Sequence, residues 1–449
     1  MLCYSCVRQN PKIRRAFPGL PLHKNKTREV GVFYGWIILA ALSAIYFFGV
    51  GTVVYGFSVI IPEIIKDMGW SRVDASLGFS ILVLVLGVSG PVAAFFLRRL
   101  GAPKLMGIGG IIAMIGVLGC YNMTSLFQYY LFMGAIAVGL ALLGGVACTH
   151  TITNWFARKR ALALGVFMSM GGLGAFFAAP VISLLVQSTG NWRNAWLAMA
   201  AATLIGSVVA VLFVRDKPED MGTFMDGVDP SLNSGATAAP SRVHQTTVSW
   251  EVKDAVLTMP FWITVLAAAL AVFGFFVVNS QGVLHLSDKG ISPITAASAI
   301  GIIGMFGAGG RLLTGVLGDR LDPRYLLSFG LALELVAIVL LIYANNELLT
   351  YACAVILGAG NGMAIVASPA LVANYYGHKN YASLIGIHGM VVIVVGSSGP
   401  IVAAHVFESI GSYTPVFLSF AAVAMLPVII TLWMRPPVLR GLTVQTVNT

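Results

Sequence analysis

Long apolar segments recur along this chain and constrain its fold more than any other feature. Segments of about 20 residues, the length at which an α-helix crosses the hydrocarbon core of a bilayer, occur twelve times in the 449-residue sequence. Only 10% of the residues are charged, whereas about a quarter of a soluble globular chain is charged. We therefore predict an all-α integral membrane protein whose transmembrane helices lie near residues 35–60, 75–97, 104–121, 128–153, 161–187, 193–214, 260–284, 294–318, 325–343, 349–374, 382–406 and 413–434.

The basic residues are divided unevenly between the two sides of such a protein. Of the 27 Lys and Arg residues, 22 fall in the two tails and in every second loop. One more, Arg311, lies inside an apolar segment, and the opposite side carries Lys66, Arg72, Arg193 and Lys289. Because cytoplasmic loops carry the excess of Lys and Arg, both termini are predicted to be cytoplasmic. We expect a multi-pass protein that is embedded in the lipid bilayer of the plasma or inner membrane. We expect no nucleic-acid partner.

One polar gap is much longer than the others and divides the segments six from six. Residues 215–256 are rich in Pro, Gly, Ser, Thr and Asp, a composition typical of a flexible linker. The predicted parts are a cytoplasmic tail, a six-helix bundle, a cytoplasmic linker, a second six-helix bundle and a second tail, at residues 1–30, 31–214, 215–256, 257–434 and 435–449. The first tail holds a lone Cys3-x-x-Cys6 pair, which is more typical of an inert tail than of a metal or redox site.

The two halves also resemble each other. The sequence NWFARKRALALG at 154–165 parallels NYYGHKNYASLIG at 374–386, with one residue inserted. A repeat in the same orientation across a chain of six plus six helices is typical of transporters built from two parallel halves.

A short motif after the eighth segment indicates the family. The stretch GVLGDRLDPR, residues 315–324, is similar to the Gly-x-x-x-Asp-Arg-x-Gly-x-Arg/Lys loop of the major facilitator superfamily. The chain resembles this superfamily from Tyr34 to Arg435. The resemblance implies the major facilitator fold and a conformational latch formed by Gly315, Asp319, Arg320 and Arg324. The copy after the second segment has Arg98 in the acidic position, which puts the latch of the N-terminal half in doubt.

Within the superfamily, the chain most resembles the oxalate/formate antiporters and the monocarboxylate transporters. Three features carry this likeness: Gly35-Trp36 at the start of the first segment, WFARKRALALG at 155–165, and an arginine four residues before Gly315. That arginine is Arg311, and the resemblance assigns it a role in binding the carboxylate of the substrate.

Arg311 is also unusual on physical grounds. It lies eight residues before Asp319, or about 12 Å along a helix. An arginine at that depth costs at least about 2.5 kcal/mol, and intramembrane charges usually face a polar cavity. Its planar fork matches a carboxylate with two hydrogen bonds. We predict that Arg311 anchors an anion; a side chain that snorkels to the headgroups, or that pairs structurally with another helix, is the alternative.

Two histidines are expected at a similar depth. His388 occupies the position at which oxalate/formate antiporters have a second cation, a lysine, and a titratable histidine suits a singly charged substrate that moves with a proton. His150 lies eight residues before Arg158. We predict a polar layer of Arg311, His388 and His150 that binds substrate, with neutral histidines bonded between helices as the alternative.

The remaining candidate site residues are weaker. Asn279 and Gln281 interrupt an apolar segment and either bind substrate or let the helix bend. Tyr46, Tyr55 and Asn361 are candidate cavity residues. Glu334 is the only acid deep in a predicted span, and we treat it with His388 as a candidate for proton coupling. The ninth helix is peripheral in this superfamily, which favours a structural role for Glu334.

The acid and the lysine that couple protons in animal monocarboxylate transporters are missing. The corresponding positions hold Gly307 and either Val54 or Tyr55. Coupling would therefore have to use other groups of this chain.

These features predict a secondary active transporter of a small organic anion that works by alternating access. A monocarboxylate such as lactate, pyruvate or formate is the first choice of substrate, and a proton or a counter-anion is the coupling ion. Alternatives are dicarboxylate or anion exchange, efflux of a drug-like compound and, from another class, a non-transporting sensor. The sequence has no nucleotide-binding loop, no His/Cys cluster with metal spacing and no paired carboxylates in the spans. We expect a monomer that is not an enzyme and that has no cofactor or metal.

Overall fold

The computed structural model describes residues 33–156, 159–227, 244, 246, 250–318, 320–377 and 379–438. Cys3, Cys6 and Asp319 lie outside the described residues, as do most of the two predicted tails and much of the linker. From Gly35 onward the described residues form one compact unit, and the fold described below is that of this unit.

Helices account for all the predicted spans. In the N-terminal half they are α3 (Tyr34–Tyr46), the π-helix η1 (Phe47–Gly51), α4 (Thr52–Met68), α5 (Arg72–Val88), α6 (Gly90–Leu100), α7 (Ala102–Tyr121), α8 (Leu126–Leu143), α9 (Gly145–Trp155), α10 (Arg160–Thr189) and α11 (Arg193–Phe213). The short elements η2 (Pro218–Met221), η3 (Met225–Gly227) and α12 (Val252–Val256) follow, and the C-terminal half consists of α13 (Met259–Asp288), α14 (Pro293–Leu317), α15 (Pro323–Ile342), α16 (Glu347–Tyr376), α17 (Tyr381–Ile410) and α18 (Thr414–Trp433).

Within the described residues, eleven helices are long and apolar enough to cross a membrane, or twelve when the bent pair α5 and α6 counts as one span. The prediction of an all-α membrane protein with twelve spans is confirmed. The exact residue boundaries of the tails, bundles and linker stay a prediction.

The loops define two ends of the helices. We call the end at which α9, α14 and α16 finish and α10, α15 and α17 begin the linker end. The end with the loops at 69–71, 122–125, 190–192, 289–292, 343–346 and 411–413 is the far end. Several far-end helices begin with a side-chain cap: Ser71 accepts from the backbone N–H of Asp74, Ser292 from that of Thr295 and Asn346 from that of Leu349. Such caps satisfy backbone N–H groups that have no partner within the helix.

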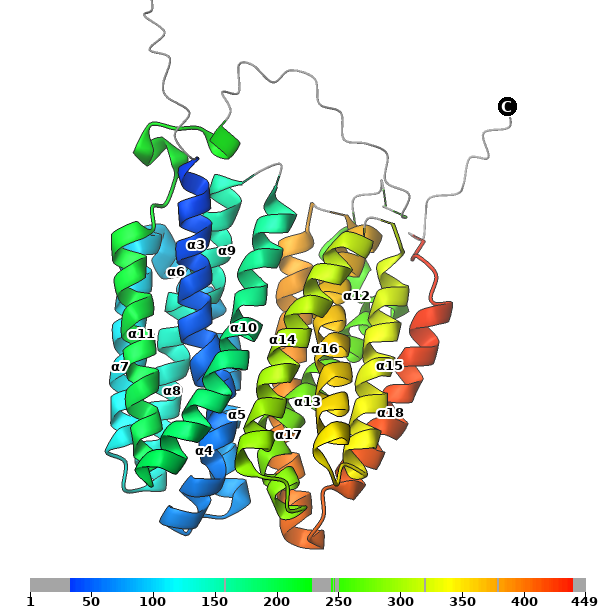
Figure 1. Cartoon of the computed structure of the whole chain (residues 1–449). Coiled ribbons are helices and arrows are strands. Elements are labelled where there is room, and N and C mark those ends of the chain that lie inside the picture. Colours follow the sequence, from blue (N-terminus) through cyan, green and yellow to red (C-terminus); the bar gives the residue numbers. More distant parts are fainter. Residues whose placement is uncertain are drawn as a thin grey trace, which may run out of the picture. The chain divides into compact units, whose positions relative to one another are not determined.

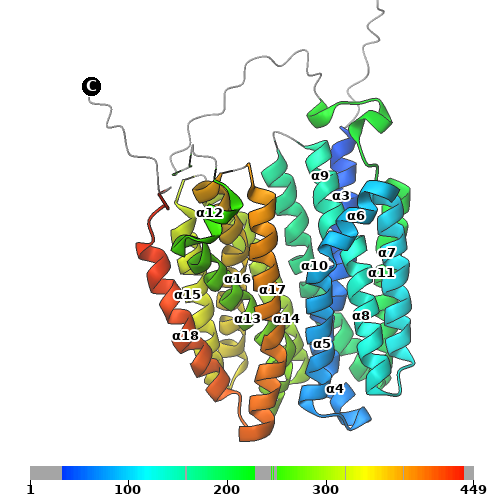
Figure 2. The ribbon, with the colours of Figure 1, turned by 180° about the vertical axis from the view of Figure 1, so that it is seen from behind.

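The two halves meet along specific helix pairs. Within the N-terminal half α7 packs on α8 and α11, and within the C-terminal half α16 packs on both α14 and α15. Between the halves, α10 packs on α14 (Figure 1) and α5 packs on α17, which lie side by side when viewed from behind (Figure 2). α4 and α13 make a third contact. Any site between the halves is therefore lined by these helices.

Candidate functional site

Arg311 lies where the two halves meet. It is half-buried on α14, and its Nη1 donates a hydrogen bond of 2.6 Å to the carbonyl oxygen of Met168 on α10. Its Nε is buried without a hydrogen-bond partner among the described residues. The cation thus contacts a helix of the opposite half through one nitrogen, while the guanidinium group retains donor capacity that a carboxylate could use.

Residues from two helices of the N-terminal half approach this guanidinium group. Besides Met168 of α10, Tyr46, the last residue of α3, interacts electrostatically with Arg311. The Tyr46 ring packs on Phe167 of α10 with a centroid distance of 4.5 Å. The chain continues from Tyr46 into the π-helix η1, and single turns of π-helix inside α-helices are frequent at functional sites.

His388 and His150 have partners of their own. His388 is buried on α17, and its Nε2 lies 2.6 Å from the hydroxyl oxygen of Ser368 on α16. His150 is exposed on α9, and its Nε2 lies 3.2 Å from the side-chain nitrogen of Asn154. Within the part of the chain that is described, no hydrogen bond or ion pair joins any two of Arg311, His388 and His150. The structure does not bring the predicted layer into direct contact, so its role in binding stays a prediction.

Asn279 and Gln281 join the halves at a seam between α13 and the helices α4 and α5. Asn279 donates to the carbonyl oxygen of Val54 at 3.3 Å, and its own carbonyl oxygen accepts from Ser58. Gln281 donates to the hydroxyl oxygen of Ser76 at 2.6 Å. Both side chains are buried in these contacts. In this conformation they hold the halves together, and a role in binding substrate would require the seam to open.

Tyr55 and Asn361 are also buried. The ring of Tyr55, on α4, meets that of Phe275, on α13, edge to face with a centroid distance of 5.9 Å. Asn361, on α16, donates to the carbonyl oxygen of Ala271 at 3.5 Å. Tyr55 therefore belongs to the same seam between the halves, whereas Asn361 contacts a helix of its own half.

Arg72 forms the most extensive contact between the halves at the far end. Its two terminal nitrogens each lie 2.8 Å from an oxygen of the Asp288 carboxylate, and Nη1 also donates to the Tyr413 hydroxyl at 2.9 Å. The guanidinium carbon stacks 3.8 Å from the centroid of the Phe407 ring. Tyr413 in turn donates to Gln281 at 2.9 Å. We call Arg72, Ser76, Gln281, Asp288 and Tyr413 the far-end network.

The far-end network was not predicted from the sequence. The one available indication was that Arg72 is among the few basic residues on that side of the protein. Burial raises the pKa of Tyr413 to about 12. Its hydroxyl therefore stays protonated near neutral pH and can donate to Gln281 while it accepts from Arg72.

The predicted latch residues are described only in part. Arg324 donates to the carbonyl oxygen of Met434 at 2.5 Å and to the Tyr325 hydroxyl at 2.7 Å, and its Nε lies 3.5 Å from a carboxylate oxygen of Asp322. The backbone N–H of Arg320 donates to the carbonyl oxygen of Leu317 at 2.9 Å. The contacts of Arg324 join α15 to the end of α18, within one half. A latch between halves through Gly315, Asp319, Arg320 and Arg324 stays a prediction.

Glu334 is a buried acid without a charged partner among the described residues. Its side chain on α15 has no exposed surface. Both carboxyl oxygens lack a hydrogen-bond partner among the described residues. The polar groups that approach it are the side-chain amide of Asn361 and the main chain at Phe275.

Two groups of membrane helices that meet around a half-buried cation define a multi-pass membrane transporter. The family follows from comparison with known proteins. The model of the Major Facilitator Superfamily matches residues 39–333 and 264–446. The chain belongs to this superfamily, whose members are transporters and not enzymes.

The relatives resemble the chain over most of its length. Human "Monocarboxylate transporter 11" is 27% identical over 399 residues, which cover 86% of this chain and 79% of the relative. "Monocarboxylate transporter 13" of Bos taurus is 26% identical over 403 residues, covering 86% of each chain. Among solved structures, a bacterial homolog of the human lysosomal transporter Spinster, inward-facing and occupied, matches with a TM-score of 0.63 at 18% identity, over 89% of this chain and 94% of the other. That structure supports the fold alone.

Proposed function

We propose that this protein transports a small monocarboxylate together with a proton, by alternating access between the two halves. The observation that carries the proposal is Arg311, a permanent cation in a membrane span that bonds to the opposite half through one nitrogen only. Relatives named monocarboxylate transporters support the substrate class.

A carboxylate suits the position of Arg311 for two reasons. Arginine presents its donors in a planar fork that matches a carboxylate with two hydrogen bonds. A single negative charge also neutralises the cation, which removes the cost of carrying a net charge through the membrane. His388 replaces a second permanent cation with a titratable group, and this favours a monoanion over a dianion.

The contacts between halves favour a state that is open at the linker end. The far-end network closes the opposite end with a bidentate ion pair and several hydrogen bonds. At the linker end, α9 packs on α6, α7, α8 and α10 of its own half, and His150 on that helix is exposed. With the orientation that the basic loops predict, this state faces the cytoplasm.

The electrical work of moving an anion across the membrane favours its coupling to a proton. Moving a bare carboxylate inward against a negative-inside potential costs about 2.3 kcal/mol per 100 mV. A proton carried with the anion removes this cost, and His388 and Glu334 are the two groups proposed from the sequence to carry it.

Uptake of labelled acids into proteoliposomes tests the proposal. Lactate, pyruvate, formate and oxalate are supplied at external pH 5.5 and 7.5 to vesicles that contain the unmodified protein or Arg311→Lys. We expect uptake of a monoanion that rises at the acid pH and falls at least about tenfold in Arg311→Lys, because lysine lacks the planar fork. Arg99→Lys is the matched control, since Arg99 is exposed and its guanidinium group stacks on Phe95 at 4.3 Å.

The competing functions give different results. Oxalate uptake that requires a preloaded anion would indicate exchange and replace the proposed symport. Transport of an acid at the same rate in Arg311→Lys would make Arg311 structural and remove the main support for an anionic substrate.

A further inference from the structure

Arg311 and Glu334 approach one turn of α16 from opposite sides. α16 lies between α14 and α15 (Figure 1). A methyl group added to Gly362 would overlap the carbonyl oxygen of Gly307 and lie 3.1 Å from the backbone nitrogen of Arg311. A methyl group added to Gly360 would lie 2.9 Å from the backbone nitrogen of Glu334. The turn at residues 358–363, which we call the glycine turn, therefore touches the backbone of both residues.

Asn361 lies on the glycine turn and provides its polar contact with Glu334. Its side-chain amide approaches the Glu334 carboxyl group while it donates to Ala271 of α13 at 3.5 Å. A carboxyl group with no exposed surface and no hydrogen-bond partner is strongly disfavoured in its charged form. In the conformation described here, Glu334 is therefore a neutral acid that holds a proton.

No other charge compensates Glu334. From α13, α16 and α18, the helices packed on α15, no charged or titratable side chain interacts with it in the described part of the chain. On α13 the nearest titratable residue along the chain is His285, about 15 Å beyond Phe275, where it bonds to the carbonyl oxygen of Leu341 at 3.1 Å. On α16 it is Cys353, about 12 Å before Asn361, and α18 has none.

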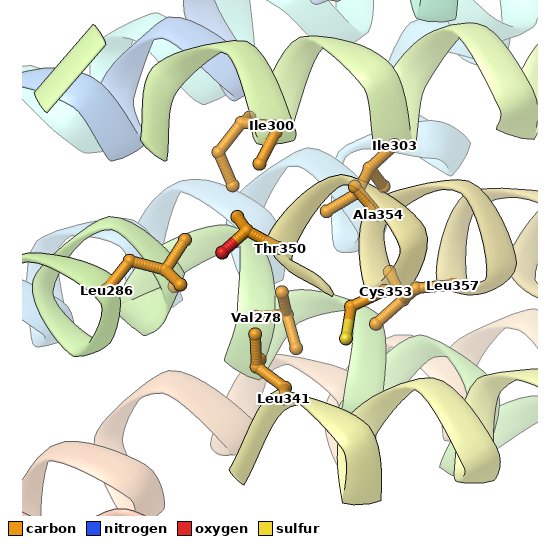
Figure 3. A pocket seen from close by; sticks show the side chains of 11 residues that line it. Val278, Leu286, Ile300, Ile303, Leu341, Thr350, Cys353, Ala354 and Leu357 are labelled. Carbon is orange, nitrogen blue, oxygen red and sulfur yellow. The ribbon is translucent and has the colours of Figure 1, made fainter. Parts of the chain in front are cut away.

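A gap in the packing lies between Glu334 and the far end. A cavity of about 20 Å³ is enclosed by α13, α14, α15 and α16, with Val278, Leu341, Thr350, Cys353 and Leu357 among its lining residues (Figure 3). A volume of this size holds roughly one water molecule. Leu341 is about 10 Å from Glu334 along α15, and Leu357 is one turn from Asn361. The lining is apolar apart from the Thr350 hydroxyl and the Cys353 thiol, so the cavity offers a water molecule few hydrogen-bond partners.

We infer that Glu334 is the proton-binding site of this transporter, and that the glycine turn couples its protonation to anion binding at Arg311. This inference rests on the proposed function. The charges balance in the two forms that cross the membrane: one combines the Arg311 cation with a Glu334 carboxylate, and the other combines the Arg311 cation, the bound anion and neutral Glu334. In the conformation described here Glu334 has already taken up its proton, and the anion binds at Arg311 after it. The proton enters from water on one side and returns to water on the other, so one acid and one proton cross together.

The test compares two transport modes, counterflow and net uptake, in Glu334→Gln. The glutamine amide imitates the neutral acid but cannot release a proton. Counterflow of the labelled acid against unlabelled acid at equal pH needs no proton release, so we expect it to fall less than threefold. Net uptake driven by acid outside needs proton release and should fall at least tenfold, with partial recovery in Glu334→Asp. Glu347 is an acid on the same helix as Asn361, and Glu347→Gln is the matched control. Its net uptake and its counterflow should change by the same factor.

Three outcomes overturn the inference. Equal losses in both modes would make Glu334 structural, and unchanged net uptake would make it irrelevant to coupling. If net uptake falls more than counterflow in His388→Gln, and not in Glu334→Gln, the proton-binding site is His388.

Infrared spectroscopy tests the protonation state without transport. The difference spectrum of the unmodified protein minus Glu334→Gln should contain the C=O stretch of a protonated carboxyl group at neutral pH. Its absence contradicts the inference even if no acid of the panel is carried, whereas its presence together with a lack of acid transport would refute the proposed function alone.

Discussion

At the scale of single residues, Arg72 and Arg193 show how similar side chains at one end of the protein differ in what they join. Arg193 donates to the carbonyl oxygens of Tyr121 and Met123 at 2.8 and 3.0 Å, all within the N-terminal half. Arg72 pairs with Asp288 and Tyr413 of the other half. Of these two arginines, only Arg72 has contacts that must break if the halves separate at the far end.

This difference gives a prediction for Arg72→Lys. Lysine retains the charge but loses the fork that bonds to both oxygens of Asp288, so the closed far end should be less populated. We expect an impermeant maleimide added at the far end to label Ser58→Cys several-fold faster in the Arg72→Lys background, because Ser58 is fully buried in the seam. Arg193→Lys is the matched control, and the protein without Ser58→Cys gives the background of the native thiols. Equal labelling rates in the two lysine variants would show that Arg72 does not hold the far end closed.

Sequence reasoning located single unusual residues better than pairs. Arg311 and Glu334 were identified because a charge within an apolar run is visible in the sequence itself. The Arg72–Asp288 pair was not identified because its members lie 216 positions apart, and only the packing of α5 beside α17 and of α4 beside α13 brings them together. The Ser368–His388 contact was missed for the same reason.

At the scale of helices, hydropathy predicted the spans, but not where they bend. α5 and α6 meet at 49°, where Ser89 separates the two helices and Pro91 begins the next turn. Proline lacks a backbone N–H and so cannot continue the hydrogen-bond pattern of the preceding helix. The π-helix η1 was also not predicted, because its extra residue per turn leaves the apolar pattern of the segment intact.

The contact between α10 and α14 depends on a close approach of the two backbones. A methyl group added to Gly172 would overlap the carbonyl oxygen of Gly304. Gly172→Ala should therefore force the helices apart and destabilise the protein by about 1–3 kcal/mol, the usual range for overpacking. Thermal unfolding in detergent measures this effect as a lower melting temperature.

Gly165→Ala, on the same helix, is the control. A methyl group there would lie 3.6 Å from a side-chain carbon of Leu312, an ordinary contact. Its melting temperature should stay level or rise slightly, because alanine favours a helix over glycine by about 0.5–1 kcal/mol. Equal melting temperatures for the two variants would contradict the close approach.

At the scale of the whole molecule, the proposed transport cycle combines a closed far end, a cation between the halves and a buried acid on the other side of α16. The superfamily could be predicted from the sequence because its motif and its six-plus-six layout are properties of the chain order. The placement of Asn279 and Gln281 in the seam could not, because it depends on which conformation the two halves adopt.

Symport of an acid and a proton is tested by following both at once. Proteoliposomes that contain the unmodified protein and a trapped pH-sensitive dye receive a labelled monocarboxylate, with protein-free liposomes correcting for passive entry of the neutral acid. We expect the lumen to become acidic in step with tracer entry, with about one proton for each acid. Tracer entry without acidification, or entry only in exchange for a preloaded anion, would contradict it.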